Sequence, residues 1–148
     1  MYLDDLIIRS MEERDAASIS LLMPELDYEA SEQTILRRFE DVFARSCECV
    51  FVAELNSQVV GFCHATGVRR IDSDGYGEIL TLVVRNEFHR QGIGGHMVRY
   101  ASDWIYANGF SRVRLGSGVH RVEAHIFYES LGFTKSRPGC VFELRKTM

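Results

Sequence analysis

The chain has 148 residues, 46% of them hydrophobic and 26% charged, which is typical of a single soluble globular domain spanning residues 1–148. Its formal net charge of −4 argues against nucleic acid as the main partner, because a phosphate-binding surface needs an excess of lysine and arginine. No apolar run approaches the roughly 18–20 residues that cross a bilayer, and the acidic N-terminus does not resemble a signal peptide, so we expect a cytoplasmic protein without a membrane partner.

The N-terminal half predicts a short strand, two helices and a hairpin. Apolar residues recur every three to four positions after Asp15 and again after Ser31, which is a favourable N-cap residue. The period then changes to that of strands, and the turn residues Asn56 and Ser57 separate two such runs. We expect, in chain order, a strand at 6–9, helices at 15–22 and 34–44, and a hairpin of strands at 50–55 and 59–65.

The C-terminal half contains the strongest strand of the chain, 78–84, whose mostly apolar residues predict a central position covered on both faces. A polar loop follows, and residues 91–95 open a long helix with one apolar face and Gly109 as its C-terminal cap. We then expect a strand at 113–115, a helix at 122–131, and late strands from 133 onward and at 141–144. This order of strands and helices predicts a mixed α/β layer fold.

The cysteines and histidines form no pattern typical of a metal site. The four cysteines are Cys47, Cys49, Cys63 and Cys140. They include no C-x-x-C pair, and we interpret them as reduced thiols of a cytosolic protein. His120 and His125 are five positions apart, which does not place them together on one helical face, so we expect no catalytic metal.

The loop after the central strand has the properties of a phosphate-binding segment. The first turn of a helix leaves its N–H groups unpaired and carries a partial positive charge. Gly92, Gly94 and Gly95 let those groups approach an anion without a Cβ in the way. We interpret the loop as a pyrophosphate cradle built mainly from backbone N–H groups; the alternative is a tight turn that needs glycine for its geometry alone. The full G-x-G-x-x-G pattern and the G-K-[ST] of a P-loop are both missing.

At this segment the sequence resembles the GNAT superfamily of acetyl-CoA-dependent N-acetyltransferases. The family signature [Q/R]-x-x-G-x-[G/A], which follows a strand like Ile-x-x-Leu-x-Val, is matched by the strand 79–84 and the loop 90–94, while its first position is His89. A second family segment, A-x-x-x-Y-E-x-x-G-F, is matched by 124–133, with Arg121 where the family often has Asn. The N-terminal strand and the hairpin also fit, so the resemblance covers nearly the whole chain.

The resemblance implies the GNAT fold, a mixed α/β sheet of about six to seven strands flanked by about four helices and splayed at the cofactor cleft. Acetyl-CoA would be the cosubstrate, with its pantetheine arm paired to main-chain groups of Leu82 and Val84 and its pyrophosphate on the glycine loop. The N–H of Val83 or Val84 would polarise the thioester carbonyl. The implied cofactor-binding residues are Leu82, Val83, Val84, His89, Arg90, Gln91, Gly92, Ile93, Gly94, Gly95 and Arg121.

Two further residues are candidates for the proton transfers of acetyl transfer, which needs a deprotonated amine and a proton for the departing thiolate. Glu78 lies eleven positions before His89, where some GNAT histone acetyltransferases keep a glutamate base. The resemblance implies that role for Glu78, directly or through a water, and the role of acid for Tyr128. The alternatives are a solvated strand-end carboxylate and a core tyrosine with its hydroxyl at the surface.

The expected reaction transfers the acetyl group of acetyl-CoA to a primary amine by direct attack, with a small-molecule amine as the acceptor. His120, Arg121, His125 and Arg114 are candidates for binding an anionic group of that acceptor; a solvated polar loop is the alternative. Two other activities stay open: acetylation of a protein lysine or N-terminus, and non-catalytic acyl-CoA sensing on the same fold. A homodimer is the commonest assembly, but no sequence feature fixes the oligomeric state.

Overall fold

The computed structural model describes residues 5–117, 121–136 and 139–146. The chain forms two compact units, Met1–Gly116 and Ser117–Met148. The first unit contains the strands β1 (Leu6–Ser10), β2 (Glu48–Leu55), β3 (Gln58–Val68), β4 (Tyr76–Val84) and β5 (Val113–Leu115). Its helices are α1 (Ala16–Leu22), α2 (Glu32–Phe43) and α3 (Ile93–Ala107), with the short 3₁₀ turns η2 (Glu13–Asp15), η3 (Met23–Leu26) and η4 (Asn86–Phe88). The second unit contains α4 (Val122–Ser130).

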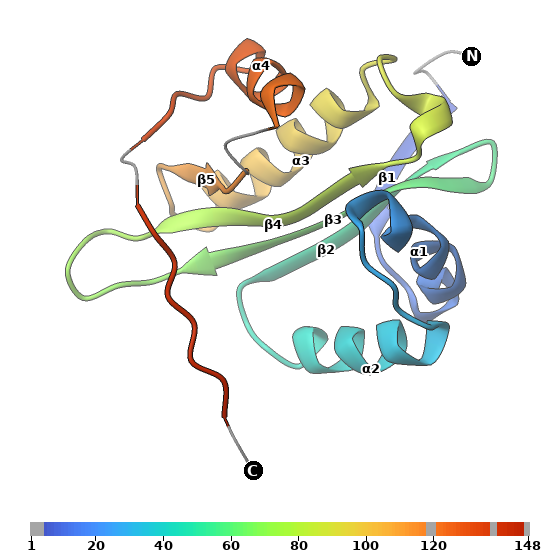
Figure 1. Ribbon diagram of the computed structural model, residues 1–148, viewed down its shortest axis with the longest axis horizontal. Helices are drawn as coiled ribbons and strands as arrows, with labels where there is room; N and C mark the ends of the chain where they lie inside the picture. Colours follow the sequence, from blue (N-terminus) through green and yellow to red (C-terminus); the bar gives the residue numbers. More distant parts are fainter. Residues whose placement is uncertain (1–4, 118–120, 137–138, 147–148) are drawn as a thin grey trace. The chain divides into compact units, whose positions relative to one another are not determined.

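The five strands form one mixed sheet in the order β1-β2-β3-β4-β5. Neighbouring strands are antiparallel from β1 to β4, and β5 alone runs parallel to its neighbour. Figure 1 shows α3 along one face of this sheet and α1 and α2 on the other. The hairpin between β2 and β3 turns at Asn56 and Ser57, which both have positive φ, as expected of its tight loop. The mixed α/β fold predicted from the sequence is thus confirmed.

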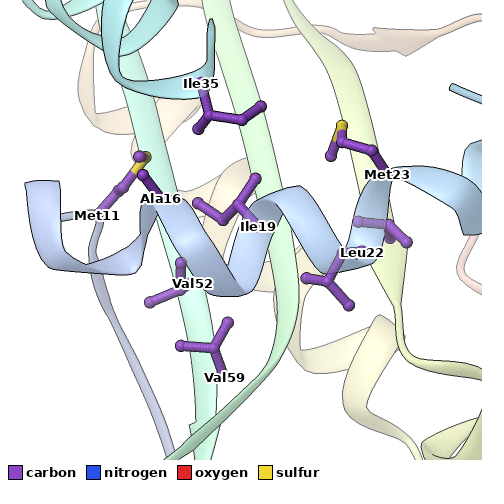
Figure 2. Close-up of a cluster of buried hydrophobic side chains, with 9 residues drawn as sticks. Met11, Ala16, Ile19, Leu22, Met23, Ile35, Val52 and Val59 are labelled. Carbon is purple, nitrogen blue, oxygen red and sulfur yellow. The ribbon is translucent and has the colours of Figure 1, made fainter. Parts of the chain in front are cut away.

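The face under α1 and α2 holds a hydrophobic cluster (Figure 2). Its buried members are Met11, Ala16, Ile19, Leu22, Met23, Ile35, Val52, Val59 and Val83. The cluster thus joins both N-terminal helices to β2, β3 and β4. Helix α2 begins as predicted, because the Ser31 hydroxyl accepts a hydrogen bond from the Thr34 N–H at 3.1 Å.

An ion pair joins β1 to the start of α1. The guanidinium of Arg9 donates to both oxygens of Asp15, at 2.8 and 2.9 Å, and also to Glu54 on β2. Burial of Asp15 disfavours its charged form, but the hydrogen bonds from Arg9 and from the Glu12 N–H outweigh this and lower the pKa of the carboxyl. The pair therefore connects the first strand, the first helix and the hairpin.

Helix α3 packs so closely on the opposite face that a Cβ at either of two glycines beneath it would force a side chain of the helix to shift. A Cβ added at Gly61 on β3 would lie 2.8 Å from the sulfur of Met97, and one at Gly77 on β4 would lie 2.3 Å from two carbons of Ile105. Phe51 on β2 completes the contact through the ring of Tyr100, at a centroid distance of 4.6 Å.

Even α3 has only 15 residues, and no helix in the described part of the chain is long and apolar enough to cross a membrane.

The second unit corrects one sequence prediction. Late strands were expected from 133 onward and at 141–144, yet the described residues 133–136 and 139–146 form none, so the sheet has fewer strands than expected. In these residues the side chains of Val141, Phe142 and Leu144 are between 93% and 97% exposed. A short apolar run becomes a strand only when a neighbouring strand takes its hydrogen bonds, and that pairing is not encoded locally.

Candidate functional site

Strand β4 is paired differently along its two edges. On one edge it pairs with β3 from Tyr76 to Val84, while on the other β5 pairs with only Gly77 to Ile79. The register against β3 shifts at Leu80, which forms a bulge because the residues on either side of it face successive residues of β3. The strand therefore continues for five residues beyond the last one that β5 covers.

Main-chain groups along this uncovered edge can be assigned by their alternation. The Arg85 N–H donates to the carbonyl of Val60 on β3 at 2.8 Å. Because alternate residues of an antiparallel pair direct their N–H and C=O groups to opposite sides, Val83 also faces β3, whereas Leu82 and Val84 face the uncovered edge. The two positions expected to pair with a pantetheine arm therefore have main-chain groups on that edge. One of these groups, the Val84 carbonyl, receives a hydrogen bond from Nε2 of His89 at 2.6 Å.

The loop after β4 forms a turn of the kind that binds anions. Arg90 and Gly92 both have left-handed backbone angles, with φ of 63° and 86°. Gly92 is the N-cap of α3, and no side chain caps the first turn of that helix. Left-handed residues just before an uncapped helix N-terminus expose several N–H groups on one side, which suits a pyrophosphate. His89 uses its imidazole to hold the end of β4, so it would contribute to this cradle through its backbone.

An acidic side chain connects this loop to the segment between α1 and α2. Both carboxylate oxygens of Glu25, in η3, accept hydrogen bonds from the Asn86 N–H, each at 2.9 Å. Asn86 begins η4, and a carboxylate at a helix N-terminus is electrostatically favourable.

Glu78 lies directly opposite Thr66 on β3, so the two side chains share one face of the sheet. Helices α1 and α2 cover the same face further along these strands. On β5 it is aligned with Arg114, whose guanidinium lies 4.3 Å from the ring centroid of Tyr76 instead of pairing with the carboxylate. Glu78 is partly buried, and its carboxylate makes no hydrogen bond or ion pair within the described residues. A carboxylate in this condition has its full capacity to accept hydrogen bonds.

Sequence reasoning missed three polar residues on the same face. His64 and Thr66 alternate along β3, and both bond to Glu48 on β2: Nε2 of His64 lies 2.8 Å from one carboxylate oxygen, and the Thr66 hydroxyl donates to the other. The side chains of Glu48 and His64 are only 12% and 18% exposed. The available signal was that His64 and Thr66 follow Phe62 at every second position, which places two polar side chains on the same strand face as an apolar one.

The second unit contains the other predicted site residues. Arg121 is exposed and immediately precedes α4, and Tyr128 lies within α4 with its ring packed against Phe127 and Phe133, at centroid distances of 5.2 and 5.9 Å. His120, a candidate for acceptor binding, lies outside the described residues. In the first unit, Glu78 and the open edge therefore belong to the same strand, β4, and the loop with the glycine turn follows that strand directly. The roles of Arg121 and Tyr128 remain expectations from their place in the family pattern.

A cavity of about 610 Å³ lies elsewhere in the first unit. Its lining residues come from α1, η3 and α2 and the segment between them: Ser20, Pro24, Glu29, Ala30, Ser31, Thr34, Arg37 and Arg38. None of them belongs to β4 or the cradle. The cavity is therefore separate from the candidate site residues on β4 and in the loop that follows it.

The comparison with family models decides the identity. The model described as the acetyltransferase (GNAT) family matches residues 14–133. The chain belongs to this family. Membership makes it an acetyl-CoA-dependent N-acetyltransferase, in agreement with the resemblance of its two sequence segments.

Individual relatives agree with this assignment. The chain is 32% identical over 114 residues to the N-acetyltransferase YhdJ of Bacillus subtilis (strain 168), covering 76% of this chain and 80% of that protein. It is 35% identical over 85 residues to human N-acetylaspartate synthetase, and the aligned segment covers 57% of this chain but only 27% of the human protein. Among solved structures, aminoglycoside N-acetyltransferase AAC(6')-Iy in complex with CoA superposes with a TM-score of 0.83 at 16% identity, over 95% of each chain. That structure shows that the GNAT fold is shared.

Proposed function

We propose that this GNAT protein transfers the acetyl group of acetyl-CoA to the primary amine of a small molecule by direct attack of the amine on the thioester. One observation carries the proposal: a single strand, β4, has an edge that β5 leaves open, presents Glu78 on the face beside it, and leads directly into the glycine turn at the start of α3. Each of these features serves a different part of the same reaction.

The cradle supports the proposed mode of cofactor binding. The N–H groups of residues 90–95 would hold the pyrophosphate, and the Leu82 main chain would pair with the pantetheine arm as an added strand does. Of the two residues considered for polarising the thioester carbonyl, Val84 fits better than Val83, whose N–H faces β3. Arg121 is proposed to assist from the start of α4.

The proposed residues also account for each proton that is transferred in the reaction. Glu78, directly or through a water, would take one proton from the ammonium, and the free amine would then attack the thioester carbon. As the tetrahedral intermediate collapses, the C–S bond breaks, and the Tyr128 phenol would give a proton to the departing sulfur. The second N–H proton of the intermediate then restores the phenol through solvent, leaving the amide, free CoA and one proton on Glu78.

A small acceptor is favoured over a protein by the relatives. N-acetylaspartate synthetase and aminoglycoside N-acetyltransferase are both named for small products or substrates, and aminoglycoside acetyltransferases recur among the structural neighbours. Transfer to a protein lysine or N-terminus is the second candidate acceptor. A sensor that binds acyl-CoA without reaction would keep the cradle but would not need Glu78 or Tyr128.

Release of CoA thiol from acetyl-CoA tests the proposal. The acceptors would be spermidine, kanamycin, 2-aminoethylphosphonate, tyramine, L-aspartate and a lysine-containing peptide. We expect turnover with at least one small amine, lost in Glu78→Gln and Tyr128→Phe while the acetyl-CoA thermal shift persists. Glu40→Gln, an exposed glutamate on α2, and Tyr106→Phe, an exposed tyrosine on α3, are the matched controls. A thermal shift without turnover of any amine would favour the sensor; turnover of the peptide alone would favour protein acetylation.

The compartment is proposed from the cysteines. Cys47, Cys49, Cys63 and Cys140 are all free thiols, as expected of a protein kept in the reducing cytoplasm. Cell fractionation with an antibody against the chain tests this location.

A further inference from the structure

Three side chains beside Glu78 form a hydrogen-bonded chain with a fixed direction. The Glu48 carboxylate is bonded on one oxygen by Nε2 of His64, at 2.8 Å, and on the other by the Thr66 hydroxyl. An ionised carboxylate only accepts hydrogen bonds, so both neighbours must donate to it. Nε2 of His64 therefore carries a proton that it donates to Glu48, and the Thr66 hydroxyl proton points toward β2.

This direction leaves Thr66 with only lone pairs on its other side. A hydroxyl has one proton and two acceptor positions. The second contact of the Thr66 hydroxyl, at 3.4 Å, is with the Cys47 main-chain carbonyl, another acceptor next to Glu48 in the sequence. Both acceptors that contact the Thr66 hydroxyl thus lie at the start of β2 or just before it. Toward β4 the hydroxyl can only accept.

On β4, the residue directly opposite Thr66 is Glu78. Directly opposed residues of antiparallel strands hold their Cβ atoms about 5 Å apart, on the same face of the sheet. An ionised Glu78 carboxylate is also an acceptor, so the two directly opposed residues place two acceptors on the same face of the sheet. A group that places two or more N–H donors there would bond to both at once, and an alkylammonium has three.

The two arginines at the start of β5 do not supply that donor. Arg114 on β5 is aligned with Glu78, but its guanidinium lies over the ring of Tyr76 at 4.3 Å. Arg112 lies 5.6 Å from the same ring and donates to the Gly75 carbonyl. Within the described residues neither arginine forms an ion pair with Glu78.

We propose that Thr66 is an acceptor-binding residue of this acetyltransferase: its hydroxyl oxygen, oriented by Glu48 and His64, accepts a hydrogen bond from the ammonium of the substrate while Glu78 accepts a second. The inference rests on the proposed function, in which Glu78 takes a proton from the same amine. It adds a residue that holds the amine before and during the proton transfer, and it makes Glu48 and His64 positioning residues that act through Thr66.

The test removes the hydroxyl and keeps the shape of the strand. Thr66→Val retains the β-branched form, Thr66→Ala adds no atom, and Thr66→Ser keeps the hydroxyl. With the amine of the panel that the unmodified protein acetylates fastest, we expect the Val and Ala variants to lose about 10- to 100-fold in kcat/KM for the amine, the effect of one hydrogen bond to a charged group. The KM for acetyl-CoA should stay within about twofold, and the Ser variant should recover most of the loss.

A double variant separates this role from a structural one. If Thr66 and Glu78 hold the same ammonium, the loss in Thr66→Val combined with Glu78→Gln should be smaller than the product of the two single losses. Parental kcat/KM in Thr66→Val, equal impairment of the Ser and Val variants, or multiplicative losses would each overturn the inference, while an active-site role of Glu78 would still stand. Retained activity in Glu78→Gln, or no thiol release from any amine, would overturn the proposed function and this inference with it.

Discussion

Replacing Gly77 by alanine tests how closely α3 is seated on β4. A Cβ added there lies 2.3 Å from Cγ1 and Cγ2 of Ile105 and 2.5 Å from its Cδ1. Carbon atoms in contact are about 3.5–4.0 Å apart, so roughly an ångström must open between the helix and the strand. Ile105 is fully buried and has no solvent-exposed position to which it can move.

The magnitude follows from two opposed terms. Adding a methyl group to a well-packed interior costs about 1–3 kcal/mol. Alanine also reduces the freedom of the unfolded chain relative to glycine, which offsets about 0.4–1 kcal/mol of that cost. We expect Gly77→Ala to lower the free energy of unfolding by about 1–2 kcal/mol and the Tm by roughly 3–6 °C.

A double-mutant cycle in urea identifies the cause. Ile105→Ala removes all three atoms that the new Cβ would meet and on its own should cost about 2–5 kcal/mol. In the double variant the methyl group introduced by Gly77→Ala would enter the vacated space, so the combined cost should fall below the sum of the single costs by about 1–3 kcal/mol. Additive costs, or a Gly77→Ala protein as stable as the parent, would refute the close seating of α3.

Three further predictions address other parts of the first unit. Asp15→Asn removes the carboxylate that holds Arg9 and should cost about 3 kcal/mol at pH 7 in urea titrations. Because folding lowers the pKa of Asp15, its stabilisation is present above the ordinary carboxyl pKa and is lost as the pH falls through the folded-state value, so the variant should lose less stability on acidification than the parent. Gly92→Ala should weaken acetyl-CoA binding by calorimetry about tenfold or more, whereas Gly109→Ala, strained alike at a φ of 94° but with no atom within 4 Å of the new Cβ, should not. Burial raises the pKa of Cys63, so iodoacetamide at pH 8 should alkylate it only after unfolding, as peptide mapping would show.

Each of these has an outcome that contradicts it. Parental pH dependence in Asp15→Asn would mean that the ion pair with Arg9 does not contribute to acid stability. Equal loss of acetyl-CoA affinity in the two glycine variants would assign the effect to strain in the helix and not to the cradle. Alkylation of Cys63 at native rates equal to those in urea would mean that the interior opens readily.

Much of the fold could be predicted because its signals are local. Asn56 and Ser57 tolerate the left-handed backbone that a tight hairpin requires, and Ser31 carries the oxygen that caps α2. The apolar face of α3 recurs at the period of a helix. Each signal lies within a few residues of the structure that it specifies, so no knowledge of distant contacts is needed.

Strand pairing could not be read in the same way. Nothing within 78–84 indicates that Leu80 bulges, because the register against β3 depends on both strands together. The apolar run at 141–144 resembles a strand, but its side chains are exposed and its backbone has no ladder in the described residues. Within the described part of the chain the sheet therefore has five strands instead of the six to seven that were expected.

The site was predicted in part. Glu78 and the glycine loop were predicted from motif spacing, and the structure confirms the strand–loop–helix segment in which both lie, while their roles stay predictions. Glu48, His64 and Thr66 were missed, because a lone histidine or threonine in a strand carries no motif. Only the pairing of β2 with β3 brings Glu48 beside both.

The seating of α3 also limits how the enzyme can move during turnover. Met97 in its second turn fits over a glycine of β3, and Ile105 in its last full turn fits over a glycine of β4, so sliding the helix along the sheet would drive both side chains into backbone. Helix α3, which begins at the glycine loop, is then held in place on the sheet. The segment between α1 and α2 is bonded to the start of the loop after β4 through one exposed carboxylate, Glu25, which accepts from the Asn86 amide. Loss of that bond would weaken the connection between this segment and the loop while leaving α3 in place on the sheet.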